Sequence, residues 1–216
     1  MRIIDISKSN PIVDHFMVSL RDRDLQQDRF LFQSTIKRLG QLLAFEASKY
    51  LEYSEKQVIT PFSKCILQTI SSELILVAIV RAGIMLQEGV ESIIQAKHSI
   101  LCSCEKDRNK IRHARFSQSC DYANSSIIIS EPIMTSASSI ICCINELVKY
   151  GELKQIIILN IISTPLAIKN LETINRPNMF LLTCAIDEYT LNVRGTIPGL
   201  GDVGDLLYGP KKHYDY

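Results

Sequence analysis

Four short apolar runs mark the later part of the chain, at residues 74–80, 127–129, 156–162 and 179–185. Continuous runs of this length are typical of strands that are covered on both faces of a sheet. Helix-like stretches lie between them at 84–95, 138–150 and 165–174, and Gly151 ends the second. This alternation predicts an α/β fold with a parallel sheet flanked by helices.

A longer amphipathic helix precedes the first of these strands. It follows Asp28, a residue type that caps helix N-termini, and Gly40 weakens it slightly. Its apolar face, with steps of three and four residues, consists of Phe32, Ile36, Leu39, Leu43, Ala47 and Leu51. The sequence predicts a single domain over 1–216, with an N-terminal arm over 1–28 and a β-hairpin flap over about 103–125, where the pattern turns charged and irregular.

Charge and composition narrow the classes of partner. The 24 basic and 23 acidic residues give a net charge of +1, so a nucleic-acid partner is not expected. The longest apolar stretch falls well short of a membrane span, and Asp5 interrupts the first apolar residues. We therefore expect a cytoplasmic protein without membrane association.

Seven cysteines, an odd number, are interpreted as reduced thiols. Cys102 and Cys104 are expected on one face of a strand, where small buried side chains are favoured over metal ligands. No metal-ligating residues are predicted.

Three loops are candidates for a ligand site, because ligands of parallel sheets bind beyond the carboxyl ends of the strands. They cover 81–83, 131–139 and 187–205. In the first loop, Arg81 has the donor fork that binds phosphate or pyrophosphate, or else it forms a surface salt bridge. In the second, backbone N–H groups and hydroxyls at a helix start suit a phosphate, or else Ser136, Ser138 or Ser139 caps that helix.

The third loop contains Gly199-Leu200-Gly201-Asp202-Val203-Gly204, which formally matches the dinucleotide motif G-x-G-x-x-G. That motif must open a helix early in a βαβ unit, with an acidic residue about 20 positions later, whereas this segment lies near the end of the chain. Its glycines instead let the backbone approach a flat ligand closely and offer its edge N–H and C=O groups. A tight surface turn is the alternative.

Together these segments resemble uracil phosphoribosyltransferase, a family of type I phosphoribosyltransferases. The resemblance is carried by 80–83, Glu131-Pro132 with Ser138-Ser139, 185–188 leading to 197–205, and, near the N-terminus, 20–22 and 42–46. It implies the phosphoribosyltransferase-type sheet and the formation of UMP and pyrophosphate from uracil and 5-phosphoribosyl 1-diphosphate (PRPP), a reaction of pyrimidine salvage. Mg²⁺ would be held mainly by PRPP, and Arg81 and Asp202 would be catalytic.

The resemblance also implies two binding subsites. The residues that would bind PRPP are Arg81, Glu131, Pro132, Ile133, Met134, Thr135, Ser136, Ala137, Ser138, Ser139 and Asp202. Those that would bind uracil are Thr196, Gly201, Asp202 and Val203. A homo-oligomer is implied as well, while an effector role for GTP and the roles of Asp187 and Glu188 stay open.

The PRPP half departs from the family pattern at three positions. Glu131 stands in place of an aspartate, Ala137 in place of a glycine, and Glu105 in place of an arginine. The alternative function is therefore a catalytically impaired relative that binds uracil, UMP or another nucleotide as a sensor or regulator.

Overall fold

The computed structural model describes residues 1–106, 112–174, 176, 178–190 and 195–209. At its centre lie the strands that the apolar runs predict, β4 (Leu74–Ile79), β7 (Ser126–Ser130), β9 (Gln155–Ser163) and β10 (Met179–Ile186). They pair in parallel in the order β10-β9-β7-β4. Every residue of β4 and β7 is buried. The predicted parallel sheet, covered on both faces, is confirmed.

Four further strands extend this sheet in the described part of the chain. The sequence predicts two of them in part, through the strand that carries Cys102 and Cys104 and the hairpin flap over about 103–125. β1 (Arg2–Asp5) pairs with β10, β5 (His98–Lys106) with β4, and β8 (Ile133–Met134) with β9, all in parallel. β6 (Arg112–Phe116) pairs antiparallel with β5. The main path through the described sheet is β1-β10-β9-β7-β4-β5-β6.

The N-terminal arm and the flap differ in detail from the expectation. The segment 1–28 contributes an edge strand of the sheet besides α1 (Ile12–Arg21). The β5–β6 pair lies in the region of the predicted flap, which includes residues 107–111 outside the described part. Beyond β6 the chain leaves the pair and buries the ring of Tyr122 against the sheet.

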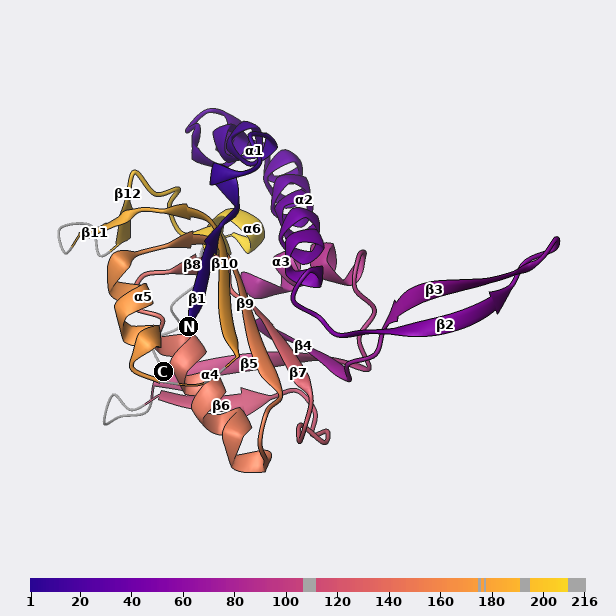
Figure 1. Cartoon of the computed structure of the whole chain (residues 1–216). Helices are drawn as coiled ribbons and strands as arrows, with labels where there is room; N and C mark the ends of the chain where they lie inside the picture. The colour runs from indigo at the N-terminus through magenta and orange to yellow at the C-terminus, as the bar shows by residue number, and fades with distance from the viewer. Residues whose placement is uncertain (107–111, 175, 177, 191–194, 210–216) are drawn as a thin grey trace.

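Helices cover both faces of the sheet (Figure 1). α1, α2 (Arg29–Ser48) and α3 (Gly83–Glu91) share one hydrophobic cluster with Leu74 and Leu76. α4 (Ser138–Leu147) and α5 (Pro165–Glu172) share another with Ile75 and Val77. Alternate residues of one strand thus enter opposite layers, as the pleat requires. The Asp28 cap is confirmed, since its carboxylate accepts a hydrogen bond from the Leu31 amide at 2.9 Å.

A two-stranded hairpin is absent from the sequence-based prediction. β2 (Tyr53–Ile59) and β3 (Lys64–Ile70) pair antiparallel and project away from the body of the molecule (Figure 1). Most of their residues are exposed on both faces. The apolar residues here are interspersed with polar ones and bury little surface, so they form no run of the kind that marks a core strand.

The remaining elements are short. Three 3₁₀ turns are η1 (Ile6–Lys8), η2 (Leu25–Gln27) and η3 (Val148–Tyr150), and Gly151 follows η3 with φ of 138°, where a helix stop is predicted. β11 (Glu188–Thr190) and β12 (Gly195–Ile197) form a small ribbon, and α6 (Val203–Tyr208) follows it. None of the helices in the described ranges combines the length and the apolar character of a membrane span.

Candidate active site

Three loops meet around one pocket beyond the carboxyl ends of β4 and β7. The pocket has a volume of about 580 Å³. Its walls come from the end of β4, from the loop after β7, and from β12 with the segment that follows it. The lining residues are Ile79, Val80, Arg81, Ala82, Glu131, Pro132, Ile133, Thr135, Gly195, Thr196, Gly201, Asp202, Val203 and Gly204. The structure therefore brings the three candidate loops together at one edge of the sheet.

Most of the predicted site residues lie on this lining, including Arg81, Asp202 and all of the predicted uracil contacts. Five predicted PRPP contacts are not part of it, namely Met134, Ser136, Ala137, Ser138 and Ser139. Glu105, exposed on β5, is also outside it. Five further lining residues were not predicted as individual contacts. Ala82, Gly195 and Gly204 belong to the candidate loops, and Ile79 and Val80 directly precede Arg81.

The loop between β7 and α4 ends in a left-handed residue. Ala137 has φ of 54° and is the N-cap residue of α4, without a side-chain hydrogen bond to the helix. The alternative of a serine cap at this helix is therefore wrong. The left-handed conformation is the one expected at this position from the glycine of the family pattern.

A buried amide fixes the start of the same loop. The side chain of Asn160, fully buried on β9, donates to the carbonyls of Glu131 and Pro132 at 2.8 and 3.0 Å. Its own oxygen accepts from the hydroxyls of Ser163 and Thr183 at 2.7 and 3.0 Å. Each buried polar group in this network has a partner, so the loop is held rigidly to the sheet.

The carboxyl of Glu131 is partly buried at the edge of the pocket. Its Oε2 atom is buried without a hydrogen-bond partner among the described residues. Burial raises the pKa of Glu131 to about 8, while the nearby Arg112 guanidinium and the Ser139 hydroxyl lower the pKa by less. At neutral pH this carboxyl therefore carries a proton for most of the time and adds little negative charge to the pocket.

Arg81 forms the salt bridge that the sequence offered as one interpretation, and phosphate binding, the other, stays a prediction. It lines the pocket, and its Nη2 also donates to Asp205 Oδ1 at 3.0 Å. Its Cζ lies 5.9 Å from the centre of the Tyr208 ring. The peptide bond that precedes Arg81 is cis, as is the bond between Ile197 and Pro198.

An ion pair from the N-terminal region holds the C-terminal loop. Asp187, directly after β10 and nearly buried, accepts two hydrogen bonds from Arg21, at 2.7 and 2.8 Å. It also accepts from the Gly199 amide at 2.9 Å, and Arg21 donates to the Gly199 carbonyl at 3.2 Å. Gly199 has φ of 63°, and a Cβ there would lie 2.3 Å from the Thr196 carbonyl oxygen. Asp187 therefore joins the N-terminal region to the C-terminal loop and helps to hold that loop in place.

Gln26 provides a second brace from the N-terminal region. Its side-chain amide donates to the Leu200 carbonyl at 2.8 Å and also to the Leu20 carbonyl. Of these supporting residues, only Asn160 has a signal in the sequence, as a lone amide within an apolar run. Arg21 and Gln26 belong to no periodic pattern that points to the loop.

The profile of the family described as uracil phosphoribosyltransferase matches residues 6–210. The chain belongs to the uracil phosphoribosyltransferase family. It is 27% identical over 215 residues to a uracil phosphoribosyltransferase from Porphyromonas gingivalis, covering 98% of this chain and 100% of that protein. It is 28% identical over 207 residues to one from Acholeplasma laidlawii, covering 94% and 97%.

A solved structure shares the fold of this family member. The AQ2163 protein from Aquifex aeolicus superposes with a TM-score of 0.83 at 24% identity, covering 96% of this chain and 98% of that one. The sequence-based expectation of the phosphoribosyltransferase-type α/β fold is confirmed by the family match and by the sheet itself.

Proposed function

We propose that this protein transfers the phosphoribosyl group of PRPP to uracil, forming UMP and pyrophosphate in pyrimidine salvage. The observation that carries this proposal is the meeting of three loops around one pocket. One is a glycine-rich segment that offers backbone groups, the second provides Arg81, and the third provides Glu131 and Thr135. The family match supports the same reaction.

The uracil half consists of Thr196, Gly201, Asp202 and Val203. Uracil is flat and presents alternating acceptors and donors along one edge, which backbone N–H and C=O groups match. The brace of Arg21 and Asp187 on Gly199 keeps this backbone in place before the base arrives. A rigid binding edge costs less ordering entropy on binding.

The PRPP half combines Arg81 with the loop after β7. The guanidinium suits the pyrophosphate group, and Glu131 to Ser139 would take the ribose hydroxyls and the 5-phosphate. A protonated Glu131 can donate a hydrogen bond to a ribose oxygen without repelling the phosphates. Ser136, Ala137, Ser138 and Ser139 lie outside the pocket lining. They lead into the N-terminus of α4, where backbone N–H groups suit a phosphate.

The chemistry proposed is direct displacement. A uracil ring nitrogen attacks the anomeric carbon of PRPP while the bond from that carbon to the pyrophosphate oxygen breaks. The proton of that ring nitrogen is released to water. Positive charge grows on the ribose ring and negative charge on the leaving group, so Arg81 stabilises the departure of pyrophosphate and Asp202, near both substrates, helps to position them. No protein nucleophile is needed.

Mg²⁺ is proposed to bind together with PRPP. Among the described residues, no group of three or more His, Cys, Asp or Glu side chains converges as a metal site. Asp202 lines the pocket with a carboxylate, the ligand type that Mg²⁺ takes alongside substrate phosphates. When bound, the ion would neutralise charge on the leaving pyrophosphate.

The test is conversion of labelled uracil in the presence of PRPP and Mg²⁺, with UMP and pyrophosphate both measured. We expect equal amounts of the two products, and little product from adenine or hypoxanthine. Arg81→Ala should lower kcat/KM by about 10²–10³. Arg38→Ala, at an exposed arginine of α2, is the matched control and should leave it unchanged. A folded protein that binds uracil without turnover would instead support the sensor function.

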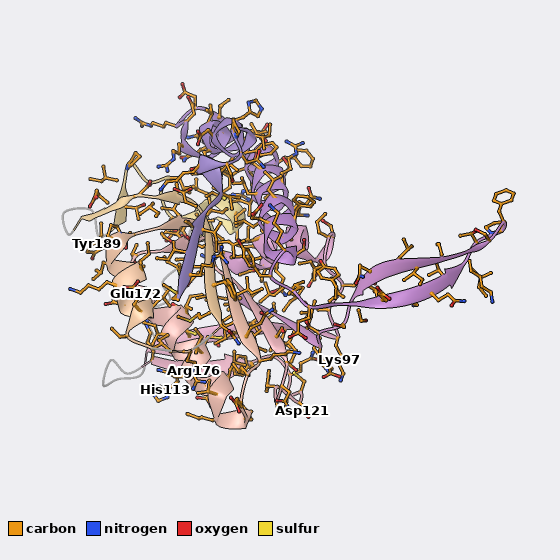
Figure 2. The ribbon with its side chains drawn as sticks, viewed as in Figure 1. Lys97, His113, Asp121, Glu172, Arg176 and Tyr189 are labelled. Atoms are coloured by element: carbon orange, nitrogen blue, oxygen red, sulfur yellow. The ribbon has the colours of Figure 1, made fainter. Side chains whose placement is uncertain are left out.

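We also propose that the protein is a homo-oligomer and that the β2–β3 hairpin takes part in the contact. The hairpin exposes several large apolar side chains, among them Ile59 at 80% and Phe62 at 98%. Its side chains project on both faces without other elements beside them (Figure 2). Exposed apolar groups gathered on one projecting element are typical of interaction surfaces.

A further inference from the structure

Three residues of α6 surround the guanidinium of Arg81. Asp205 accepts a hydrogen bond from Nη2 at 3.0 Å, and the Tyr208 ring lies 5.9 Å from Cζ. Gly204 leaves the space that the guanidinium occupies, because a Cβ there would lie 3.3 Å from Nη2. The carboxylate, the ring and the missing side chain together limit how Arg81 can lie against the helix.

The same short helix is continuous with the uracil half of the pocket. It begins at Asp202, whose Oδ1 accepts from the Asp205 amide at 3.0 Å. Leu200, Val203 and Leu207 are buried in the hydrophobic cluster that includes α2. The Gln33 side chain also donates to the Leu207 carbonyl at 3.2 Å. The helix is thus anchored to the core on one side and carries Asp205 on the other.

We propose that Asp205 is a positioning residue, which orients Arg81 toward the pyrophosphate group of the substrate and couples that group to the occupancy of the uracil half. This inference rests on the proposed function. Asp205 is not on the pocket lining, whereas Arg81, Asp202 and Gly204 are. It therefore acts through Arg81 and not on the substrate directly.

The chemistry of the guanidinium favours this role. Arginine has five N–H donors in one plane. The hydrogen bond from Nη2 to Asp205 fixes the orientation of that plane and leaves other N–H groups for a ligand. The carboxylate also repels the pyrophosphate, which opposes binding. Both side chains are more than one third exposed, at 35% and 39%, so solvent screens that repulsion, whereas the orienting hydrogen bond acts locally.

The first test separates orientation from charge with inorganic pyrophosphate and Mg²⁺ as the probe, by titration calorimetry on the whole protein. We expect Asp205→Ala to weaken binding about tenfold, and Asp205→Asn to stay within about threefold of the wild type because an oxygen acceptor remains. The control is Glu73→Ala, which removes a carboxylate from another exposed ion pair, the one with Lys97. This variant should bind pyrophosphate with the wild-type affinity. Tighter binding by both Asp205 variants, or no change in either, would overturn the proposal.

The second test measures coupling. Saturating uracil should strengthen pyrophosphate binding about fivefold in the wild type and much less in Asp205→Ala, while the affinity for uracil alone is unchanged. In turnover, Asp205→Ala should raise KM for PRPP more than KM for uracil. Coupling that survives in Asp205→Ala would contradict the coupling role.

The outcomes distinguish this inference from the proposed function. A wild type that neither binds uracil nor forms UMP contradicts the function, while the pyrophosphate titrations still decide whether Asp205 orients Arg81. If Asp205→Ala does not fold, Tyr208→Leu removes the other contact of α6 with the guanidinium and should weaken pyrophosphate binding severalfold. An unchanged affinity in a folded Tyr208→Leu would then count against the proposal.

Discussion

At the scale of single residues, the surroundings of Glu131 change the protonation state of its carboxyl group. It occupies a position at which the family pattern has a shorter acid, and its buried Oε2 lacks a partner among the described residues. Burial therefore dominates its pKa, which rises to about 8. The longer side chain keeps an acid in the PRPP half but mostly in its neutral form at pH 7.

The raised pKa of Glu131 makes stability depend on pH. The folded protein holds a proton that the unfolded chain releases near pH 4.5, so this contribution is complete below that pH and is lost as the pH rises to about 8. The expected slope is roughly 1.4 kcal/mol per pH unit within this window. We predict that Glu131→Gln removes this slope, as measured by urea unfolding from pH 4.5 to 9.

The quantity to compare is the difference in the free energy of unfolding between wild type and Glu131→Gln at each pH, because the other groups titrate equally in both proteins. Glu55→Gln, at an exposed position of β2, is the matched control and should retain the wild-type slope. Parallel stability curves for wild type and Glu131→Gln would show that the carboxyl is ionised in the folded protein throughout this range.

The ion pair of Arg21 with Asp187 is the second residue-scale feature that can be tested. Their contact is bidentate, and the Asp187 side chain is only 4% exposed. We predict that Arg21→Ala lowers the free energy of unfolding by about 3–5 kcal/mol, because it leaves a buried charge without its partner. It should also raise KM for uracil, since the Gly199 carbonyl loses its hydrogen bond from Arg21 and Asp187 is no longer held in place.

An exposed pair provides the comparison for Arg21→Ala. Lys97→Ala breaks the contact with Glu73. Both side chains of this pair are more than half exposed, so solvent screens the contact, and the loss of stability should be much smaller than for Arg21→Ala. Chemical denaturation measures both variants. If Arg21→Ala and Lys97→Ala lowered the free energy of unfolding equally, the pair of Arg21 and Asp187 would contribute no more than an exposed ion pair.

At the scale of elements, α2 and α3 cross at a pair of glycines. A Cβ on Gly40 would lie 2.4 Å from the Leu86 carbonyl oxygen, and one on Gly89 would lie 2.1 Å from the Lys37 carbonyl oxygen. Sequence analysis treats Gly40 as a slight weakness of the helix. The structure shows its benefit, which is close contact between two helix backbones.

Because the two helix backbones are so close at this crossing, we expect that adding one methyl group to Gly89 lowers the stability of the protein. Gly89→Ala should destabilise the protein by about 1–3 kcal/mol or more, although alanine is the better helix former, because two backbones must move apart. Glu88→Ala, one residue earlier and half-exposed, should change stability by about 1 kcal/mol or less. Thermal unfolding measures both. A gain in stability for Gly89→Ala would show that the helices separate easily.

At the scale of the whole molecule, the β2–β3 hairpin projects from the body and does not help to build the hydrophobic core. It adds almost nothing to either hydrophobic cluster. An isolated two-stranded hairpin is marginally stable in water, so its order is best explained by packing against another surface. This argument supports the proposed homo-oligomer.

We predict that Phe62→Asp shifts the protein toward the monomer in sedimentation velocity, because it places a charge where an apolar contact is proposed. Lys169→Asp, at an exposed position of α5 outside the hairpin, should leave the assembly unchanged. A wild type that is monomeric at micromolar concentration would contradict the proposed oligomer and the role of the hairpin in it.

Part of the site was predictable because it depends on local chemistry. Arg81, Glu131 and Asp202 each follow an apolar run or a glycine cluster, and their types suit phosphate or a base edge. Asn160 could have been noticed as an amide within a buried strand. Arg21 could not, because its partner is 166 positions away and no local pattern connects them.

By itself, the sequence determined the elements that bury apolar surface, namely the parallel strands, the covering helices and the Asp28 cap, because burial imposes a periodic pattern. It also predicted the three loops that meet at the pocket. Only the tertiary structure decided which of those residues line one pocket. It also decided that Ala137, and not a serine, is the N-cap residue of α4, and that Asp205 of α6 forms a hydrogen bond with Arg81. Such contacts join distant segments, and their energy depends on geometry that no local pattern records.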